Sequence, residues 1–306
     1  MAAPKQMFSI AFITTCKGRL HHIEQTLPTL VAEAPAQIIL VDYGCPDNTA
    51  DWVELHFPQV DVVRVKDDSG FCLPRARNMG AAIADATWLC FIDADIEATP
   101  GWLTWMTANL DTDHFYLASQ DDCQRRPEVA GTFLCTRQAF EAIGGYDEAF
   151  RGWGGEDTDI YTRLAELAYL NCASYPHGYV KPITHDDAQR TAFHTIKDVR
   201  IQSQINRCYI KTKQYLRRRG IPELSLHSRQ HLLTRIGNAL SQNRKPPKTF
   251  SIHLRPDELT RTNGEPLGFV LEISRLRSFG LFGARKTRIR TRATSLMDRL
   301  LRPFGV

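Results

Sequence analysis

The stretch TWLCFIDADIEATPGWL, residues 87–103, sets the expected fold of this 306-residue chain. It opens with an apolar run that ends at Asp93, and Asp95 follows after one residue. A continuously apolar run is typical of a strand buried on both faces of a parallel sheet. Pro100 and Gly101 then end the extended segment and open a helix. The stretch therefore predicts a central strand that delivers two carboxylates to one end of a sheet.

Three more apolar runs precede this strand, at residues 7–15, 37–44 and 60–66. Segments with helical spacing or helix-start signals separate them, at residues 20–34, 47–57 and 73–86. Strands that alternate with helices predict βαβ units in an α/β fold, with a Rossmann-like, mostly parallel central sheet and flanking helices. This domain is expected to occupy residues 1–205.

Charge divides the chain into two parts. Residues 1–205 hold 16 Lys and Arg against 28 Asp and Glu, whereas residues 206–306 hold 22 against 6. Such asymmetry indicates different roles for the two parts. Residues 206–306 are expected to form a basic, mainly helical C-terminal extension.

Cysteine usage and the N-terminus suggest a compartment. The eight cysteines are scattered without a CxxC pair, which indicates buried thiols in a reducing environment rather than a disulfide framework or a zinc site. The N-terminus shows no secretory signal pattern, and no apolar run is long enough to span a membrane. We therefore expect a cytoplasmic protein.

Polar residues follow the predicted strands at the edge where open α/β sheets bind ligands. The first strand leads to Thr14, the second to Asp42 and the fourth to Asp93 and Asp95. The last two share one side at strand spacing, and two hard oxygen ligands suit Mg²⁺ or Mn²⁺ beside phosphate oxygens. The competing interpretation is a strand-end turn with helix-capping residues. The apolar strand before the motif and the helix start after it favour a metal–diphosphate site.

A second motif, RGWGGEDTDIYTRL, occupies residues 151–164. Trp153 stands between glycines, directly ahead of Glu156, Asp157 and Asp159. Acidic residues favour the N-terminus of a helix, so a plain helix start is one interpretation and fits Asp159 well. It does not explain an aromatic residue between glycines, which indicates a mobile ring at a ligand site.

The order of these motifs resembles a known fold family. The segments FITTCKGR, ILVDYGCPDNT, LPRARNMGAA and CFIDADIEATPGW resemble, in order, the family-2-like glycosyltransferases of GT-A fold, over about residues 7–190. Residues 130–164 resemble the β4-galactosyltransferases and the bacterial chondroitin-type polymerases through their WGGED segment.

The resemblance implies a role for each motif residue. Asp157 would be the catalytic base, and Glu156 would hold an acceptor hydroxyl. Trp153 and Gly155 would complete the acceptor side, while Asp95 and His185 would bind Mn²⁺ or Mg²⁺. The nucleotide-sugar donor would contact six residues, namely Thr14, Arg19, Asp42, Arg77, Asn78 and Asp93.

Two features limit these assignments. Tyr43-Gly44-Cys45 replaces the acidic-glycine-serine turn usual in the family, so Asp42 is either a contact to the base or a turn and capping residue. The sequence does not identify the donor sugar, because residues 127–130 differ from the aromatic pattern of the galactose type.

The resemblance also bears on stereochemistry. Asp157 after Glu156 favours inversion at the anomeric carbon, since retaining relatives carry another residue there.

The basic end of the chain leaves three interpretations open. Residues 280–306 are expected to form a basic amphipathic helix with Ile289, Leu296, Leu300 and Leu301 inward. It could be a solvated face, or it could attach to an anionic inner membrane where lipid-linked acceptors reside. Nucleic-acid binding is disfavoured, because few aromatic residues lie among the arginines.

Together these observations predict a metal-dependent, inverting glycosyltransferase. It would move a sugar from a nucleotide-diphosphate sugar, with a UDP-sugar expected, to a glycan or lipid-linked glycan in bacterial-type surface polysaccharide synthesis. It would be peripheral on the inner face of the plasma membrane. The alternatives are a nucleotidyltransferase on a similar sheet and a non-catalytic sugar-nucleotide or membrane-binding scaffold.

Overall fold

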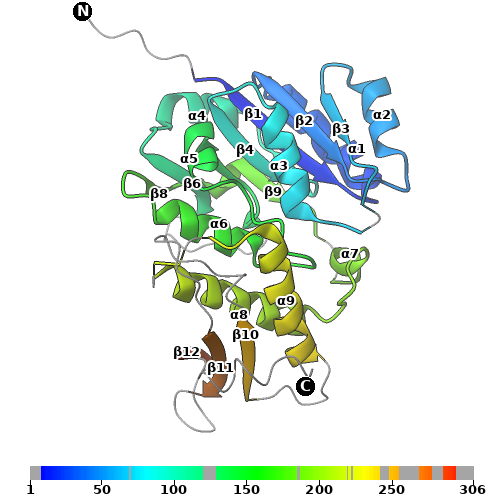
Figure 1. Cartoon of the computed structure of the whole chain (residues 1–306). Helices are drawn as coiled ribbons and strands as arrows, with labels where there is room; N and C mark the ends of the chain where they lie inside the picture. Colours follow the sequence, from blue (N-terminus) through cyan, green and yellow to red (C-terminus); the bar gives the residue numbers. More distant parts are fainter. Residues whose placement is uncertain are drawn as a thin grey trace, which may run out of the picture. The chain divides into compact units, whose positions relative to one another are not determined.

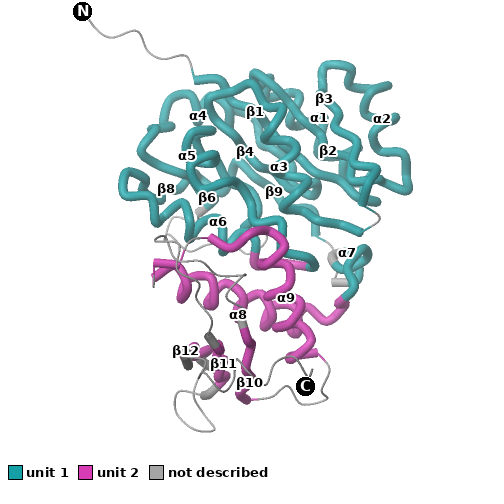
Figure 2. The backbone as a smooth tube through the Cα atoms, viewed as in Figure 1, with its two compact units in different colours: residues 1–152, 156–195 teal, residues 153–155, 196–306 magenta. Residues whose placement is uncertain are grey.

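A computed structural model describes residues 8–68, 70–119, 129–184, 187–218, 220–221, 223–241, 248–254, 269–277 and 285–293. The chain divides into two compact units (Figure 2). Unit 1 comprises Met1–Gly152 and Glu156–Thr195, and unit 2 comprises Trp153–Gly155 and Ile196–Val306. The WGG segment therefore groups with unit 2, while the carboxylates that follow it belong to unit 1.

Unit 1 contains a seven-stranded sheet in the order β3-β2-β1-β4-β7-β6-β8 (Figure 1). The first four strands pair in parallel, β7 runs antiparallel to both β4 and β6, and β6 and β8 are parallel. The predicted mostly parallel α/β sheet is confirmed. The strands are β1 (Ile10–Cys16), β2 (Gln37–Asp42), β3 (Asp61–Arg64), β4 (Trp88–Asp93), β6 (His114–Ser119), β7 (Phe133–Thr136) and β8 (Asn171–Pro176).

The central strand β4 is buried on both faces, as its apolar sequence predicts. Trp88 and Cys90 belong to one hydrophobic cluster, whereas Leu89 and Phe91 belong to a second. This alternation follows from the two-residue period of a strand, with covering elements on each side of the sheet. Buried aromatic residues, including Trp102 in the first cluster and Phe133 in the second, fill both layers.

Helices and a small second sheet complete unit 1. The helices are α1 (Leu20–Ala32), α2 (Thr49–His56), α3 (Leu73–Ile83), α4 (Trp102–Asn109), α5 (Arg137–Ala142), α6 (Glu156–Ala165) and α7 (Asp187–Thr191), with a 3₁₀ turn η2 (His177–Tyr179). Strand β5 (Ile96–Ala98) follows the Asp93–Asp95 motif and pairs antiparallel with β9 (Val180–Pro182). The later part of unit 1 is thereby held beside this motif.

The described residues of unit 2 form two helices and a three-stranded antiparallel sheet. The helices are α8 (Val199–Arg217) and α9 (Leu226–Ser241), and the strands are β10 (Thr249–Leu254), β11 (Phe269–Arg277) and β12 (Arg285–Ala293). The boundary predicted after residue 205 falls inside α8.

The predicted helix over residues 280–306 is wrong for residues 285–293, which form β12. In this strand Thr287, Ile289 and Thr291 alternate with charged residues. β-Branched residues at every second position favour a strand, and the pairing of Ile289 with Ile273 of β11 fixes the register. The extension is therefore mixed rather than mainly helical. Leu296, Leu300 and Leu301 lie outside the described residues.

Within the described ranges, every helix is too short or too polar to cross a lipid bilayer.

Candidate active site

A buried arginine joins the two sequence motifs. Arg77 lies near the start of α3, which Pro74 opens at a position where a missing N–H costs nothing. Its side chain is 2% exposed and donates from Nη2 to Oδ1 of Asp93 at 2.6 Å and from Nη1 to Oδ1 of Asp157 at 2.8 Å. The two carboxylates, 64 positions apart in the sequence, therefore share one guanidinium at the end of the central strand.

Tyr146 supports this arginine from the side. Its hydroxyl lies 3.1 Å from Nη1 of Arg77, and its ring centroid lies 5.0 Å from the guanidinium carbon. A planar guanidinium held by two carboxylates and an aromatic ring is fixed in orientation. In the structure Arg77 therefore positions Asp93 and Asp157, and its contact with the donor stays a prediction.

Glu156 adds a third carboxyl group to this cluster. It is the first residue of α6 and is buried. Burial, with the charge of Asp157 as the next contribution, raises the pKa of Glu156 to about 8. Near neutral pH this carboxyl therefore holds its proton, and it can donate a hydrogen bond as well as accept one.

Gly131 closes the site on the side of β7. A Cβ atom at this position would lie 2.2 Å from Oδ2 of Asp93 and 2.6 Å from Nη2 of Arg77. Any side chain here would push apart the Arg77–Asp93 pair. The residue therefore has to be glycine because the backbone approaches the ion pair too closely for any other.

Asp95, which the sequence predicts as a metal ligand, follows Asp93 by two residues. Its side chain is 13% exposed, and its Oδ2 lies 3.4 Å from Nη1 of Arg19. Its backbone carbonyl accepts a hydrogen bond from the N–H of Ile183 at 2.7 Å. His185, two residues after Ile183, lies outside the described residues. A carboxylate together with an imidazole, as the sequence predicts for Asp95 and His185, would be a donor set that fits Mn²⁺.

A different group has metal-ligand geometry. Among the described residues, Asp111, Asp113 and His114 place ligand atoms within 4.8 Å of one another. They lie at the start of β6, which runs in the same direction as β4 because β7 is antiparallel to both. This group therefore lies at the amino-terminal end of the strands, whereas Asp93 and Asp95 lie at the carboxyl-terminal end. The predicted metal residues are not part of it.

The predicted base contact, Asp42, has the hydrogen bonds of a turn and capping residue. Its Oδ1 accepts from the N–H of Cys45 at 2.7 Å, and its Oδ2 accepts from the N–H of Ala50 in α2 at 2.8 Å.

Thr14, the predicted donor contact of the first strand, lies in β1. Its buried Oγ1 has no hydrogen-bond partner among the described residues. Such an unpaired buried hydroxyl is compatible with a ligand contact.

Asn78, a predicted donor contact, forms hydrogen bonds with Tyr146 and Glu148 of the same unit. Its Nδ2 donates to the carbonyl of Tyr146 at 3.0 Å and to Glu148 at 2.8 Å, and its Oδ1 accepts from the N–H of Tyr146. Asn78 thus fixes the loop that precedes the WGGED segment. Asp159 is also structural, because it forms a buried ion pair with Arg163 at 2.8 Å within α6.

The WGG segment is held by the first helix of unit 2. Asn206 of α8 donates from Nδ2 to the carbonyls of Trp153 and Gly154. Gly154 and Gly155 have φ angles of +77° and +95°, in the region that glycine adopts without strain. The side chain of Trp153 remains 37% exposed. The predicted mobility of the Trp153 ring stays a prediction, and nothing in the sequence indicated that Asn206 holds this backbone.

Lys17 and Phe193 are site candidates that the sequence did not single out. Nζ of Lys17 donates to the carbonyl of Tyr43 at 2.8 Å and lies 5.4 Å from the centroid of the Phe193 ring. Phe193 also lies against Gly18, where an added Cβ would be 2.5 Å from the ring. The segment after α7 therefore covers the turn that follows β1, at the ligand edge of the sheet. The only signal in the sequence was the polar turn containing Lys17.

Comparisons with known proteins agree with this architecture. Residues 114–186 match a family model described as the N-terminal domain of galactosyltransferase. Polypeptide N-acetylgalactosaminyltransferase 3 of Taeniopygia guttata is 25% identical over 61% of this chain, and polypeptide N-acetylgalactosaminyltransferase 6 of Homo sapiens is 24% identical over 61%. This chain spans 39% of the length of each of these relatives.

A solved structure of GalNAc-T7 with UDP, GalNAc and Mn²⁺ superposes with a TM-score of 0.50 at 14% identity. The match covers 95% of this chain and 72% of that one. The fold is therefore that of the GT-A glycosyltransferases, as the motif order predicted. The sequence matches point to the same class, with N-acetylgalactosaminyltransferases among the similar proteins.

Proposed function

We propose that this protein is a metal-dependent glycosyltransferase that moves a sugar from a UDP-sugar to a hydroxyl group of a glycan or lipid-linked glycan. The observation that carries the proposal is the Arg77 guanidinium, which holds Asp93 of the donor motif and Asp157 of the acceptor motif together. The similar N-acetylgalactosaminyltransferases make UDP-GalNAc the first donor to test.

The residues of the cluster divide the chemistry between them. Asp157 accepts the proton of the acceptor hydroxyl, because an alcohol is a poor nucleophile near neutral pH. Glu156, protonated when no ligand is bound, donates a hydrogen bond to an acceptor oxygen. Trp153 offers an aromatic face to the sugar, and Arg77 keeps the aspartates in position.

Metal and stereochemistry complete the proposal. Asp95 would hold Mn²⁺, with His185 as the expected second protein ligand, and the bound cation would neutralise the leaving diphosphate. Attack by the acceptor hydroxyl, with Asp157 as its base, inverts the anomeric carbon. A donor with an α-linked sugar would then give a β-linked product.

Calorimetric titration with UDP and GDP, each with and without Mn²⁺, tests the donor and metal assignments. We expect UDP to bind at least ten times more tightly with Mn²⁺, and Asp95→Ala to abolish that difference. Equal UDP affinity with and without the metal would remove Asp95 from a metal site. No binding of either nucleotide would overturn the proposed function.

The stereochemical part needs a separate measurement. Turnover of UDP-GalNAc with a panel of glycan acceptors, followed by the anomeric proton coupling in the product, distinguishes the two outcomes. A β-linked product supports Asp157 as base. An α-linked product would show retention and would assign a different role to Asp157.

We also propose a location for the protein, on the cytoplasmic side of the plasma membrane and peripheral to it, in a pathway that builds surface polysaccharide. The excess of 22 basic over 6 acidic residues after residue 205 supports this, because anionic lipid attracts such segments. Deletion of residues 294–306, which follow β12, should reduce co-sedimentation with anionic vesicles and leave UDP binding unchanged. Unchanged sedimentation would exclude that segment as the anchor.

A further inference from the structure

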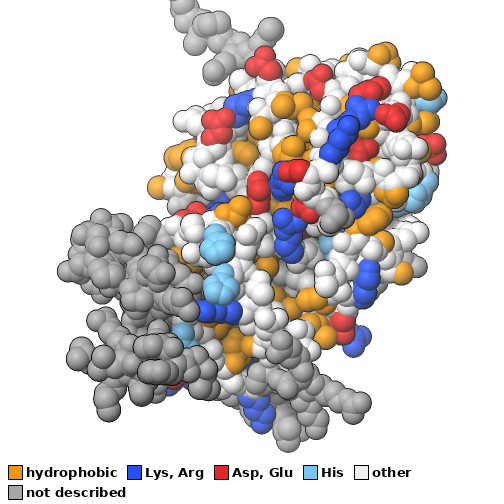
Figure 3. All heavy atoms as spheres, turned by 45° about the vertical axis from the view of Figure 1, so that its right-hand side comes forward, with side chains coloured by type: hydrophobic (Ala, Val, Ile, Leu, Met, Phe, Trp, Pro, Cys, Tyr) orange, Lys and Arg blue, Asp and Glu red, His pale blue; other side chains and the backbone are white. Residues whose placement is uncertain are grey.

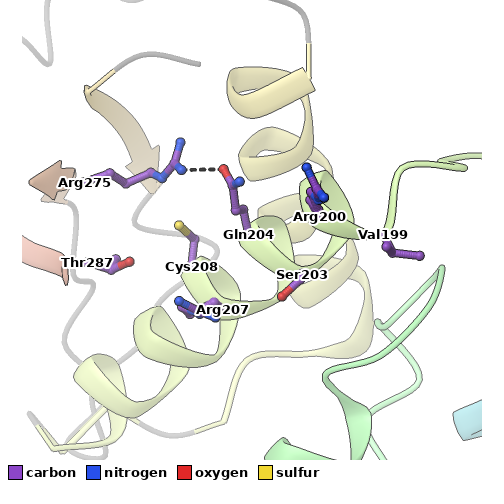
Figure 4. A pocket seen from close by; sticks show the side chains of 8 residues that line it. All are labelled: Val199, Arg200, Ser203, Gln204, Arg207, Cys208, Arg275 and Thr287. Atoms are coloured by element: carbon purple, nitrogen blue, oxygen red, sulfur yellow. Dashed lines mark hydrogen bonds between the residues drawn. The ribbon is translucent and has the colours of Figure 1, made fainter. Parts of the chain in front are cut away.

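Unit 2 contains a pocket of about 310 Å³ between α8 and the sheet (Figure 4). This volume is at the lower end of the range for small-molecule sites. Most of the lining side chains are polar or basic, and none of the lining residues described is acidic. They are Val199, Arg200, Ser203, Gln204, Arg207, Cys208, Arg275 and Thr287.

Secondary structure explains why these residues meet. Residues 200, 203, 204, 207 and 208 recur at three- and four-residue spacing, so they share one face of α8. Arg275 of β11 and Thr287 of β12 are direct cross-strand partners, so they share one face of the sheet. Helix face and sheet face together form the walls seen in Figure 4.

The three arginines differ in how they are held. Arg275 donates to Oε1 of Gln204, which fixes its guanidinium across the pocket. Arg200 and Arg207 are exposed, and no ion pair with another described residue occupies either of them. The start of α8 is already capped, because Asp198 accepts from the N–H groups of Arg200 and Ile201. The positive character of the pocket therefore comes from side chains rather than from the helix terminus.

We propose that this pocket binds a phosphate-type anion, either a phosphomonoester or a diphosphate. Guanidinium groups match the geometry of phosphate oxygens, and Ser203, Gln204 and Thr287 add neutral donors. Three arginines, with no carboxylate among the described lining residues, favour a multiply charged anion over a neutral sugar. The residues of this pocket belong to unit 2, whereas those of the proposed donor site, Arg77, Asp93 and Asp95, belong to unit 1.

Pyrophosphate titration of the full-length protein in the presence of EDTA tests the proposal. Chelation removes the metal on which diphosphate binding in unit 1 would depend, and the Asp95→Ala variant checks this. We expect one saturable site that is weakened at least tenfold by the double substitution Arg200→Gln and Arg207→Gln. Both side chains are exposed, so the fold should persist, and the melting temperature verifies it.

Arg288→Gln with Arg290→Gln is the matched control, because these arginines are exposed and lie on the other face of β12. The control should weaken pyrophosphate binding less than twofold. If both double substitutions weaken pyrophosphate binding equally, the anion binds through the diffuse positive charge of unit 2, and the proposed site is wrong. The absence of saturable pyrophosphate binding would also overturn the proposal. If the pocket fails while Mn²⁺-dependent UDP binding remains, the proposed function stands.

Vesicles distinguish the two sources of such an anion. We compare co-sedimentation with vesicles that contain phosphatidic acid and with vesicles of equal charge that contain phosphatidylserine. If the pocket variant loses binding to phosphatidic acid vesicles alone, and the control variant keeps it, the ligand is a lipid phosphate head group. If only pyrophosphate binding is lost, the ligand is a soluble phosphate compound.

Discussion

The buried arginines of unit 1 and the exposed arginines of unit 2 are suited to different tasks. In unit 1, Arg77 is 2% exposed and contacts two carboxylates, and Arg163 is 6% exposed and paired with Asp159. In unit 2, Arg200, Arg207, Arg288 and Arg290 are exposed. A buried arginine with fixed partners positions other groups, whereas an exposed arginine remains available to an external anion.

The surface of unit 1 shows a third arrangement. Acidic and basic side chains are intermixed on the face in Figure 3. Arg64, for example, pairs with Asp51 and Glu54, and Arg75 pairs with Asp67. Exposed pairs of this kind contribute little to stability.

The sharpest test of this comparison is Asp157→Asn. We expect turnover to fall by about 10²- to 10⁴-fold, the usual range for loss of a general base, with UDP binding nearly unchanged. Asp159→Asn in the same helix turn is the control, and it should lower the melting temperature while largely preserving turnover per folded molecule. Steady-state rates of both variants, per folded molecule, measure this difference in turnover. Near-normal turnover of Asp157→Asn would exclude this carboxylate as the base.

Arg77→Met tests the buried arginine itself. The substitution leaves Asp93 and Asp157 without their shared partner, and breaking a buried ion pair costs about 3–5 kcal/mol. Urea unfolding should show this loss, while Arg75→Met, which breaks only partly exposed pairs, should change the unfolding free energy by less than about 1 kcal/mol. Similar losses in both variants would mean that burial does not distinguish the two arginines.

Glu156→Gln tests the proton that Glu156 is expected to hold. The folded-state pKa of about 8 lies above the ordinary value of 4.5, so the folded protein retains a proton that the unfolded chain releases between these values. Stability should therefore fall as pH rises from about 5 to 8, by up to roughly 1.4 kcal/mol per pH unit. In Glu156→Gln this slope should disappear. Parallel melting curves across this pH range in both proteins would show that Glu156 is already ionised.

Gly155→Ala should have the smallest effect. A Cβ here would lie 2.7 Å from Cβ of Asn206, and the φ of +95° adds backbone strain, so a loss of about 1–3 kcal/mol is expected. Gly154→Ala carries strain at φ +77° but meets no neighbour within 4 Å. The difference between the two variants in thermal unfolding measures the contact with Asn206. Equal losses would assign the whole effect to strain.

Much of unit 1 followed from local sequence. The four parallel strands and the helix starts at Leu73, Trp102 and Glu156 lie within a few residues of their predicted positions. Buried strands are apolar throughout, and proline, glycine and acidic residues mark where helices begin, so the chain carries these signals locally. In unit 2 the prediction of a helix over β12 was wrong, because the alternating residues of this strand were interpreted as one face of a helix.

The sequence by itself determined the order of the motifs, the class of fold and the presence of a carboxylate pair and a glycine-flanked tryptophan. Only the tertiary structure decided that Arg77 bridges Asp93 and Asp157, that Asn78 binds the loop around Tyr146, and that Asn206 holds the backbone at Trp153. These contacts join residues 16 to 80 positions apart. Local patterns specify helices and strands, whereas which distant side chains share a charge depends on how those elements pack.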